Sequence, residues 1–243
     1  MSLFVSFEGG EGSGKTTQVA ILLRRLEESG RSAVLLREPG MTPLGNAARD
    51  WLKRSRPKKD ALAEGAELFL FAAARAQMVA KVLRPALQEN VVVVCDRYAD
   101  STTAYQGYGR KGDLARVAVV NEIATDGVMP DLTILLDCPP DHGLGRVRSG
   151  QMEFPLGVEA PPEGRVDPAG DRRYEMEPVA FHKRVRAGYL EMAAAEPDRW
   201  RVVDASRSVD EVGDEVWRHV SERLPRPDTR TATANALDRP AQA

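Results

Sequence analysis

A glycine-rich turn near the start of the chain constrains its fold more than any other feature. The run reads Phe4-Val5-Ser6-Phe7-Glu8-Gly9-Gly10-Glu11-Gly12-Ser13-Gly14-Lys15-Thr16-Thr17, in which four residues separate Gly9 from Gly14-Lys15-Thr16. This is the spacing of a P-loop, whose backbone N–H groups surround a phosphate because glycine permits close approach and positive φ. An apolar run precedes the turn, and residues 18–28 carry a helical pattern after it. The turn therefore predicts a strand–loop–helix unit that binds a nucleotide, in preference to a chance cluster of glycines.

The chemistry of such a loop predicts the roles of individual residues. The loop lysine reaches the β- and γ-phosphates, the hydroxyl residue after it ligates Mg²⁺, and the helix dipole adds positive potential. Lys15 is therefore predicted to be catalytic and Thr16 to bind the metal ion. The predicted nucleotide-binding set is the whole turn: Gly9, Gly10, Glu11, Gly12, Ser13, Gly14, Lys15, Thr16 and Thr17.

Composition argues against several classes of partner. The 243 residues include 36 acidic and 34 basic side chains, a net charge of −2, so we expect no nucleic-acid or membrane-surface binding. We see no signal peptide, and no apolar run approaches the about 20 residues of a membrane span. Cys95 and Cys138 each follow an apolar run and are expected to be buried thiols. The expected location is the reducing cytoplasm.

Strand-like and helix-like segments alternate along the chain. Besides the first run, continuous apolar segments typical of buried parallel strands occupy residues 33–36, 91–95, 132–137 and 201–203. Helical patterns occupy residues 43–53, 60–88, 113–125, 141–148, 177–195 and 209–223. Thr42 is a candidate cap for the helix that starts at Pro43, and Pro85 is a possible break. The alternation predicts an α/β fold with a five-stranded parallel sheet and helices on both faces.

Two stretches differ from this pattern. Residues 149–171 are dense in glycine and proline without a helical or strand period, which predicts a long functional or disordered loop. Residues 225–243 are polar and aperiodic, which predicts a disordered C-terminal tail. We therefore expect one domain over residues 1–224, with a lid at about residues 149–175, followed by the tail.

An acidic and a basic residue follow the third strand-like run. Val91-Val92-Val93-Val94-Cys95 leads directly into Asp96-Arg97. Ligands of parallel sheets bind at the carboxyl ends of the strands, so both side chains should face the same crevice as the P-loop. Asp96 could hold Mg²⁺, and Arg97 could bridge donor and acceptor phosphates. A surface salt bridge is the less favoured interpretation.

Further motifs occur in order along the chain. They are Arg37-Glu38-Pro39-Gly40-Met41-Thr42-Pro43-Leu44-Gly45, Phe71-Ala72-Ala73-Ala74-Arg75-Ala76-Gln77, Asp96-Arg97-Tyr98 with Ser101, Ala104-Tyr105-Gln106-Gly107-Tyr108-Gly109-Arg110 and Pro130-Asp131-Leu132-Thr133-Ile134-Leu135-Leu136-Asp137. With the P-loop they resemble the bacterial thymidylate kinases, which are P-loop nucleoside monophosphate kinases. The resemblance implies a three-layer P-loop kinase fold with a lid, and a homodimer formed through long helices. It also implies Mg²⁺-dependent transfer of the γ-phosphoryl group of ATP to dTMP, giving dTDP and ADP for dTTP biosynthesis.

The resemblance also implies an acceptor site, residue by residue. Arg75 and Arg97 are expected to hold the dTMP phosphate, and Phe71 to stack on the thymine. Tyr105 is expected under the deoxyribose, where its ring disfavours a 2′-hydroxyl, and Glu11 near the 3′-hydroxyl. The other expected substrate-binding residues are Glu38, Pro39, Ser101, Thr102 and Gln106, the last two near the base edge.

The stacking residue has a competitor in the same helix. Phe69 and Phe71 both occur in Leu68-Phe69-Leu70-Phe71, and either could belong to the core. Phe71 is favoured because it lies four positions before Arg75 and so shares its helical face.

A lid arginine completes the expected catalytic group. An extra cation near the moving phosphate aids phosphoryl transfer, and P-loop residues 10–13 include no basic residue. By resemblance, Arg172-Arg173-Tyr174-Glu175-Met176-Glu177 matches the end of the lid and gives Arg173 this role, with Arg146 and Arg148 as second candidates. The expected catalytic residues are therefore Lys15, Arg97, Arg173 and Glu11.

The sequence departs from the family pattern at several positions. The lid is longer than usual, over roughly residues 150–170, and Arg172 stands where the family usually has an acid. Ala74 replaces the acid before the helix arginine, which is then expected to be held more loosely, or by Glu38. Met41 replaces a glycine and is expected to stiffen its turn.

Other functions remain open at this stage. One is a related kinase for dUMP or a deoxynucleoside, and another is a P-loop protein that binds a nucleotide without catalysis. GTPase switching is disfavoured because no Asn-Lys-x-Asp stretch follows the later strands.

Overall fold

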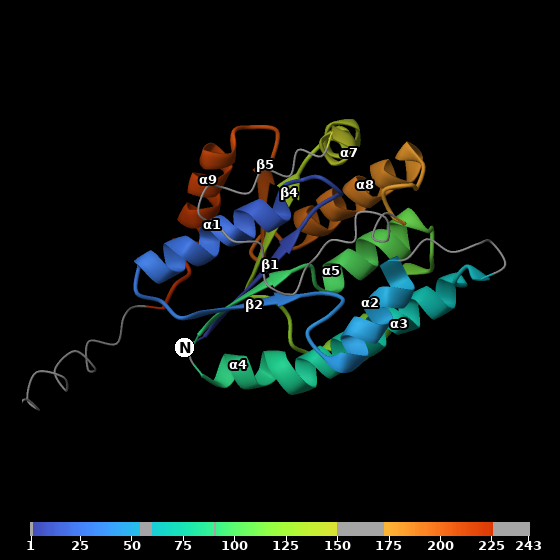
Figure 1. Cartoon of the computed structure of the whole chain (residues 1–243), viewed down its shortest axis with the longest axis horizontal. Helices are drawn as coiled ribbons and strands as arrows, with labels where there is room; N and C mark the ends of the chain where they lie inside the picture. Colours follow the sequence, from blue (N-terminus) through green and yellow to red (C-terminus); the bar gives the residue numbers. More distant parts are fainter. Residues whose placement is uncertain (1, 54–59, 90, 150–172, 226–243) are drawn as a thin grey trace, which may run out of the picture.

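Five parallel strands form the centre of the protein (Figure 1). The computed structural model describes residues 2–53, 60–89, 91–149 and 173–225. The strands are β1 (Leu3–Glu8), β2 (Ala33–Arg37), β3 (Val92–Asp96), β4 (Leu132–Asp137) and β5 (Trp200–Asp204). Their order in the sheet is β2-β3-β1-β4-β5, and all neighbours are parallel. The predicted α/β sheet is confirmed, and the strand that leads into the P-loop lies in its middle.

Helices connect the strands. They are α1 (Lys15–Glu28), α2 (Pro43–Lys53), α3 (Glu64–Met78), η2 (Val79–Leu83), α4 (Arg84–Gln88), α5 (Ala99–Thr102), η3 (Thr103–Gly109), α6 (Leu114–Thr125), α7 (Pro140–Ser149), α8 (Val179–Ala195) and α9 (Val209–Ser221). The predicted helices agree with these to within a few residues at each end. The sequence patterns missed α5 and η3, because residues 99–109 mix polar, aromatic and small residues with no single period.

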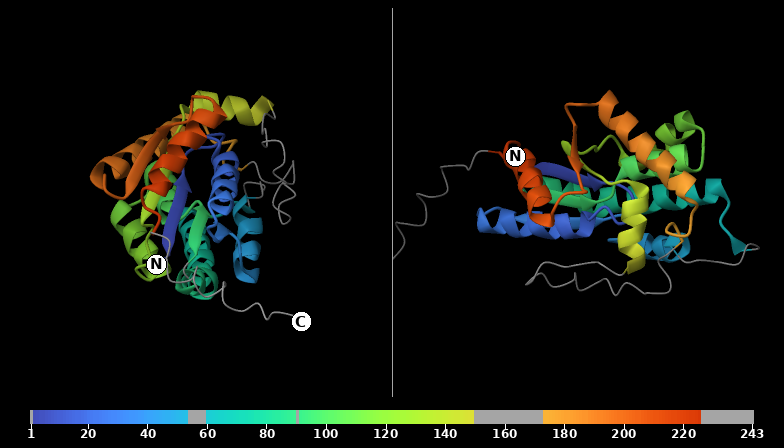
Figure 2. Two further views of the ribbon diagram at one scale, coloured as in Figure 1. Left: turned by 90° about the vertical axis from the view of Figure 1, so that its left-hand side faces the viewer. Right: turned by 90° about the horizontal axis from the view of Figure 1, so that it is seen from above.

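The sheet lies between two helical layers, as two further views show (Figure 2). Helices α1 and α9 pack on one face, against the alternate side chains Leu3, Val5 and Phe7 of β1. Phe4 points to the opposite face, where it packs with Met78 at the end of α3. Because both faces are covered, β1 is apolar or buried at every position and does not alternate with solvent.

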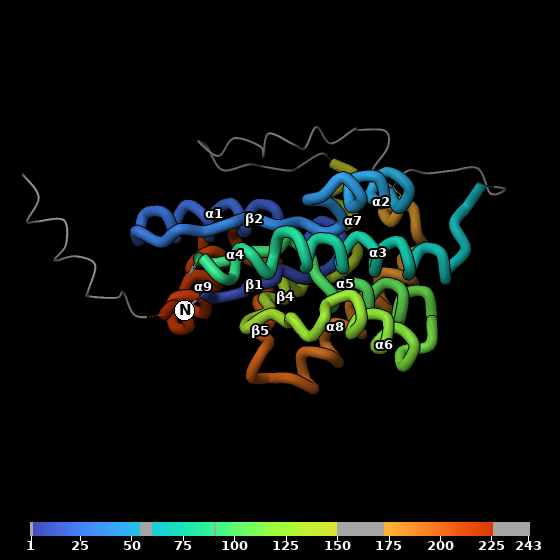
Figure 3. Tube along the Cα trace, turned by 90° about the horizontal axis from the view of Figure 1, so that it is seen from below, coloured from blue at the N-terminus to red at the C-terminus, as the bar shows by residue number. Residues whose placement is uncertain are grey.

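Pro85 does not break the long helix on the second face. Figure 3 shows α3, η2 and α4 as one continuous rod, with α2 and α6 on either side of α3. The π-helical turn η2 closes with a bond from the N–H of Arg84 to the carbonyl of Val79. Pro85, which has no N–H to donate, directly follows this turn as the second residue of α4. The possible break is therefore a change of helix type.

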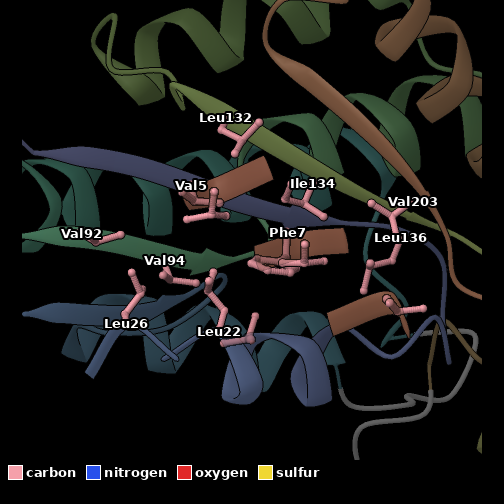
Figure 4. Packing of buried hydrophobic residues seen from close by; sticks show 14 of the residues in the cluster. Val5, Phe7, Leu22, Leu26, Val92, Val94, Leu132, Ile134, Leu136 and Val203 are labelled. Atoms are coloured by element: carbon pink, nitrogen blue, oxygen red, sulfur yellow. The ribbon is translucent and has the colours of Figure 1, made fainter. Parts of the chain in front are cut away.

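The largest core cluster lies between the sheet and α1 (Figure 4). Leu22 and Leu26 of α1 are at most 1% exposed and pack with side chains of the four strands β1, β3, β4 and β5. This cluster anchors α1 on the sheet, and with it the P-loop that joins β1 to α1.

A side-chain cap starts α2, as the sequence predicts. The hydroxyl of Thr42 accepts a 3.0 Å hydrogen bond from the N–H of Gly45, and α2 begins at Pro43. The cap holds the start of α2 just after β2, so the residues that follow β2 are fixed at the edge of the sheet that also carries the P-loop.

Several expectations concern residues outside the described part. The expected lid at about residues 149–175 lies there for the most part, and so do Arg172 and nearly all of the expected tail at residues 225–243. Among the described helices, none combines the length and the apolar character that a membrane crossing requires.

Candidate active site

The P-loop follows β1 directly, and the side chain of Lys15 folds back across the loop to contact its carbonyl groups. Gly14, the residue directly before α1, adopts φ 88°, a left-handed conformation that suits glycine. Lys15 is 8% exposed, and its ammonium donates hydrogen bonds to the carbonyls of Gly9 at 3.2 Å and Gly10 at 2.8 Å. The lysine is therefore positioned where phosphates would meet the backbone N–H groups of the loop.

Burial weakens the hold of Lys15 on its proton. Removal from water is the main cause that lowers the pKa of Lys15 to about 8, and the nearby guanidinium of Arg97 adds to it. The carboxylates of Glu11 and Asp96 act in the opposite direction but do not outweigh these effects. Without a ligand, an appreciable fraction of Lys15 is neutral at pH 8.

This lowered pKa predicts proton uptake when a nucleotide binds. A phosphate placed beside Lys15 favours its charged form and raises its pKa, so binding of ADP at pH 8 should take up about half a proton. At pH 6.5 Lys15 is already charged and contributes no uptake. Calorimetry at pH 8 in buffers of different ionisation enthalpy measures the uptake, and Lys15→Met should remove it. Equal proton uptake by the wild type and Lys15→Met would contradict the assignment.

Helix α7 packs directly on the P-loop through two glycines. A Cβ atom at Gly12 would lie 2.0 Å from the carbonyl oxygen of Gly143, and a Cβ at Gly143 would lie 2.2 Å from that of Glu11. Arg146, one turn further along α7, donates a 3.1 Å hydrogen bond to the carbonyl of Ala205, after β5. The outer side of the P-loop therefore contacts the backbone of the helix that leads to residues 150–172.

Arg97 connects the P-loop to the residues that the sequence predicts to bind the acceptor. It follows β3 with φ 70°, an uncommon conformation for a residue with a side chain. Its guanidinium donates 3.1 Å hydrogen bonds to the carbonyl of Gly9 and to the carboxylate of Glu11. It also lies 5.0 Å from the centre of the Tyr105 ring, whose hydroxyl donates to Glu11 at 2.8 Å. The structure thus brings together the predicted residues Glu11, Arg97 and Tyr105.

The same contacts keep Glu11 charged. Burial alone would raise the pKa of Glu11, but the positive charges of Arg97 and Lys15 outweigh it, and together with the other neighbours they lower it to about 2. The stability that this carboxylate contributes is therefore present above its ordinary pKa of 4.5 and is lost only as the pH falls towards 2.

A second buried acid lies behind Arg97, and the sequence did not point to it. Glu8 at the end of β1 accepts hydrogen bonds from the N–H of Tyr98 at 2.8 Å and from the hydroxyls of Ser101 at 2.5 Å and Tyr189 at 2.8 Å. Burial, with a contribution from Asp100, raises the pKa of Glu8 to about 7. Its only signal in the sequence is an acid at the end of an apolar run.

A cavity opens beside Arg97, and every residue predicted to bind the acceptor lines it. These residues are Glu38, Pro39, Phe71, Arg75, Arg97, Ser101, Thr102, Tyr105 and Gln106. Glu11 and Asp96 also line it, and so do Arg37, Arg49, Lys53, Tyr98, Tyr174 and Glu175, which the sequence interpretation left out. Several of these side chains are basic, which suits an anionic ligand. The spacing of Arg49 and Lys53, one helical turn apart on α2, could have indicated their shared face.

Arg75 is held deep in the cavity wall by Glu38. The side chain is 1% exposed, and its Nε and Nη2 donate to Glu38 at 2.9 and 2.6 Å. Nη1 donates to Asn121 at 2.8 Å and Nη2 to Thr102 at 2.9 Å. Of the two expectations for Arg75, the structure therefore shows the second, in which Glu38 holds it, and not a loosely held side chain. Arg75 bonds to Glu38, Asn121 and Thr102, whereas Arg97 bonds to Gly9 and Glu11 of the P-loop.

Arg173, the expected lid arginine, contacts helices α2 and α3 in this structure. Arg173 forms an ion pair with Glu67 of α3 and donates a 3.1 Å hydrogen bond to the carbonyl of Leu52. Of the second candidates, Arg146 bonds to Ala205 as described, and Arg148 is exposed on α7. Of the departures, Met41 adopts φ 68°, a conformation that a glycine would adopt without strain.

The two predicted metal ligands, Thr16 and Asp96, both carry oxygen atoms and both lie close to Lys15. Thr16 is exposed in the first turn of α1, and Asp96 at the end of β3 lies near enough to Lys15 to affect its pKa. Among the described residues, no group of three His, Cys, Asp or Glu side chains forms a metal centre of its own. These donors are of the kind that Mg²⁺ takes together with phosphate oxygens.

Comparison with known proteins places this site in a family. The family model described as thymidylate kinase matches residues 7–216. Thymidylate kinase of Syntrophotalea carbinolica is 48% identical over 92% of this chain and 97% of its own length. That of Thermomicrobium roseum is 46% identical over 93% and 98%. The crystal structure of thymidylate kinase from Ehrlichia chaffeensis is similar with a TM-score of 0.66 and 30% identity, covering 90% of this chain and 98% of that one.

Proposed function

Because this chain belongs to the thymidylate kinase family, and so transfers the γ-phosphoryl group of ATP to dTMP, we propose that its P-loop holds Mg·ATP and that the adjoining cavity holds dTMP. The position of Arg97 carries this assignment. Its guanidinium bonds to Gly9 and Glu11 in the loop, and the same side chain lines the cavity. One cation therefore lies between the two binding regions, where the phosphoryl group must pass.

Positioning and charge neutralisation supply most of the catalysis in phosphoryl transfer. Lys15 and the P-loop N–H groups neutralise the donor phosphates, and Arg97 neutralises the acceptor phosphate. Arg173 is proposed to add a further cation, because P-loop residues 10–13 contain none. To reach the phosphates, Arg173 must leave its ion pair with Glu67.

The hydroxyl of Thr16 and the carboxylate of Asp96 are proposed to hold Mg²⁺. Their place beside Lys15 supports this, since Mg²⁺ is bound through few protein oxygens and several phosphate oxygens. The bound ion would neutralise charge on the donor phosphates. Asp96 would hold the ion from the end of β3 and Thr16 from the first turn of α1.

The cavity is proposed to hold dTMP with its phosphate at Arg97 and its base towards α3. Phe71 offers an aromatic face for the thymine, and Tyr105 lies against Arg97 and Glu11, where the sugar would join phosphate to base. Thr102 and Gln106 also line the cavity and are proposed to lie near the edge of the base. Arg75, held by Glu38, contributes positive charge to the cavity wall.

An acceptor panel tests this function. Formation of ADP from Mg·ATP is measured with dTMP, dUMP, dCMP, dGMP, dAMP and thymidine. Turnover that favours dTMP is the expected result. Turnover that favours another acceptor would retain the roles of the P-loop and overturn the assignment of Phe71, Tyr105 and Gln106. Nucleotide binding without turnover on any acceptor would favour the non-catalytic alternative.

The two phenylalanines of α3 give a prediction with a built-in control. Phe71 lines the cavity, whereas Phe69 is 64% exposed on the same helix. We expect Phe71→Ala to raise the KM for dTMP by about tenfold, since an aromatic contact contributes about 1 kcal/mol beyond its buried area. The KM for ATP should change little. Phe69→Ala should leave both KM values unchanged. Equal effects of the two substitutions on the KM for dTMP would exclude Phe71 as the stacking residue.

A homodimer is also proposed. The two neighbouring helices α3 and α6 expose Phe69, Val119 and Ile123, of which Ile123 is 73% exposed. Adjacent apolar side chains of this kind are typical of a surface that a partner covers. Sedimentation at micromolar concentration measures the mass directly, and a monomer there would contradict the proposal.

We further propose that the protein acts in the cytoplasm as one catalytic domain over residues 1–224, in which about residues 149–175 form the lid. Cys95 and Cys138 are both free and buried, in keeping with a reducing compartment. The family match over residues 7–216 supports a single domain that includes the lid.

A further inference from the structure

A buried carboxylate on α3, that of Glu67, also contacts a residue of the acceptor cavity. Glu67 is 1% exposed and accepts a 2.7 Å hydrogen bond from Nε2 of Gln106. Two arginines balance its charge: Nε of Arg110 lies 3.4 Å away, and Arg173 forms the ion pair described above. Gln106 lines the cavity, so Glu67 lies directly behind a residue of the acceptor site.

The contact with Glu67 determines which way the Gln106 amide faces. A carboxylate paired with the guanidinium of Arg110 stays ionised and only accepts, whether or not Arg173 leaves, so it bonds to the NH₂ group of Gln106 and repels the amide oxygen. The hydroxyl of Tyr174, 3.4 Å from the same nitrogen, stands on the same side. The amide oxygen of Gln106 is therefore turned away from Glu67, and it is the group that Gln106 can offer to a ligand.

An amide oxygen in this position distinguishes between pyrimidines. Thymine and uracil carry an N–H donor at N3, which this oxygen can accept. Cytosine has an unprotonated acceptor at N3, which the same oxygen repels. An unmade hydrogen bond to a buried polar group is costly, so a site built this way discriminates strongly.

We propose that Glu67 is a positioning residue for base specificity: it fixes the Gln106 amide so that its oxygen selects a pyrimidine with an N3–H donor. This rests on the proposed binding of dTMP in the cavity. Glu67 itself does not touch the substrate and acts through Gln106.

The ratio of kcat/KM for dTMP to that for dCMP tests the proposal. Glu67→Gln replaces the carboxylate by an amide that can also donate, so the Gln106 amide is free to reverse. We expect the ratio to fall at least about tenfold, through both a loss with dTMP and a gain with dCMP. A purely structural role would lower both rates together and leave the ratio unchanged, which would overturn the proposal.

Three controls make the result decisive. Glu67→Asp keeps a group that only accepts and should preserve most of the ratio at a lower rate. Glu64→Gln changes an exposed acid one turn earlier on α3 and should leave both rates unchanged. If Glu67→Gln does not fold, Gln106→Asn, whose amide is one methylene shorter, should lose the discrimination in its place. Wild-type turnover of dTMP tests the proposed function separately, because its absence would refute that function whatever the variants do.

Discussion

Replacing Lys15 with alanine should abolish phosphoryl transfer while leaving the protein folded. The ammonium lies over the P-loop carbonyls of Gly9 and Gly10, so its removal takes away a positive charge that is fixed beside the donor phosphates. Loss of one preorganised charge at a transferring phosphoryl group costs about 10²–10³ in kcat, and we expect at least this loss. Initial rates with Mg·ATP and dTMP at saturating concentrations measure it.

The thermal stability of Lys15→Ala should not fall together with its activity. Burial lowers the pKa of Lys15, so folding disfavours its charged form at neutral pH, and removing the side chain relieves this cost. We therefore expect a Tm equal to or slightly above that of the wild type. Lys81→Ala, at an exposed lysine of η2, is the matched control and should retain full activity. Normal turnover by Lys15→Ala would exclude the role assigned to Lys15. Arg97→Ala should lose turnover nearly as completely as Lys15→Ala.

Adding one methyl group to α7 should have the second largest effect. In Gly143→Ala the new Cβ would lie 2.2 Å from the carbonyl oxygen of Glu11, far inside van der Waals contact, and the obstructing atom belongs to the backbone. Either α7 or the P-loop must move. Overpacking of this kind costs about 1–3 kcal/mol of unfolding free energy, and a displacement of about 1 Å near the chemistry can cost about 10²-fold in rate.

Gly145 on the same helix provides the control for this prediction. It is exposed, and a Cβ there meets nothing within 4 Å. Gly145→Ala should raise the stability slightly, because alanine favours a helix by about 1 kcal/mol over glycine, and should leave kcat unchanged. We expect Gly143→Ala to lower kcat and to raise the KM for ATP more than the KM for dTMP. The interpretation fails if the two variants have the same Tm and kinetics.

The sequence predicts the sheet and which residues line the cavity, because both depend on local patterns. The strands are continuous apolar runs, and the P-loop, Arg97 and the lining of the cavity lie in short motifs that follow strands or share a helical face. Since the carboxyl ends of parallel strands meet at one edge, segments far apart in the chain are brought to the same cavity.

The supporting contacts could not be predicted in the same way. Glu67 meets Gln106 across 39 positions, and Asn121 meets Arg75 across 46, with no periodicity that relates either pair. The close approach of Gly12 to Gly143 depends on how α7 packs, which no local pattern records. The π-helical segment η3 is another case, because it mixes residue types without the period of an α-helix.

The strand order separates the residues that contact the acceptor from those that support the far flank of the P-loop, at opposite sides of the sheet. The acceptor cavity is lined from the side of β2 and β3, by residues that follow these strands and by α3. The opposite flank of the P-loop touches α7 after β4, and Arg146 ties α7 to the loop after β5. Among the described residues, the P-loop after β1 contributes to both halves, and Tyr174 and Glu175, before α8, also line the cavity. Mutational drift on one half can therefore change the nucleotide that is phosphorylated while the phosphate donor stays the same, so a new acceptor preference can evolve on this scaffold without rebuilding the ATP site.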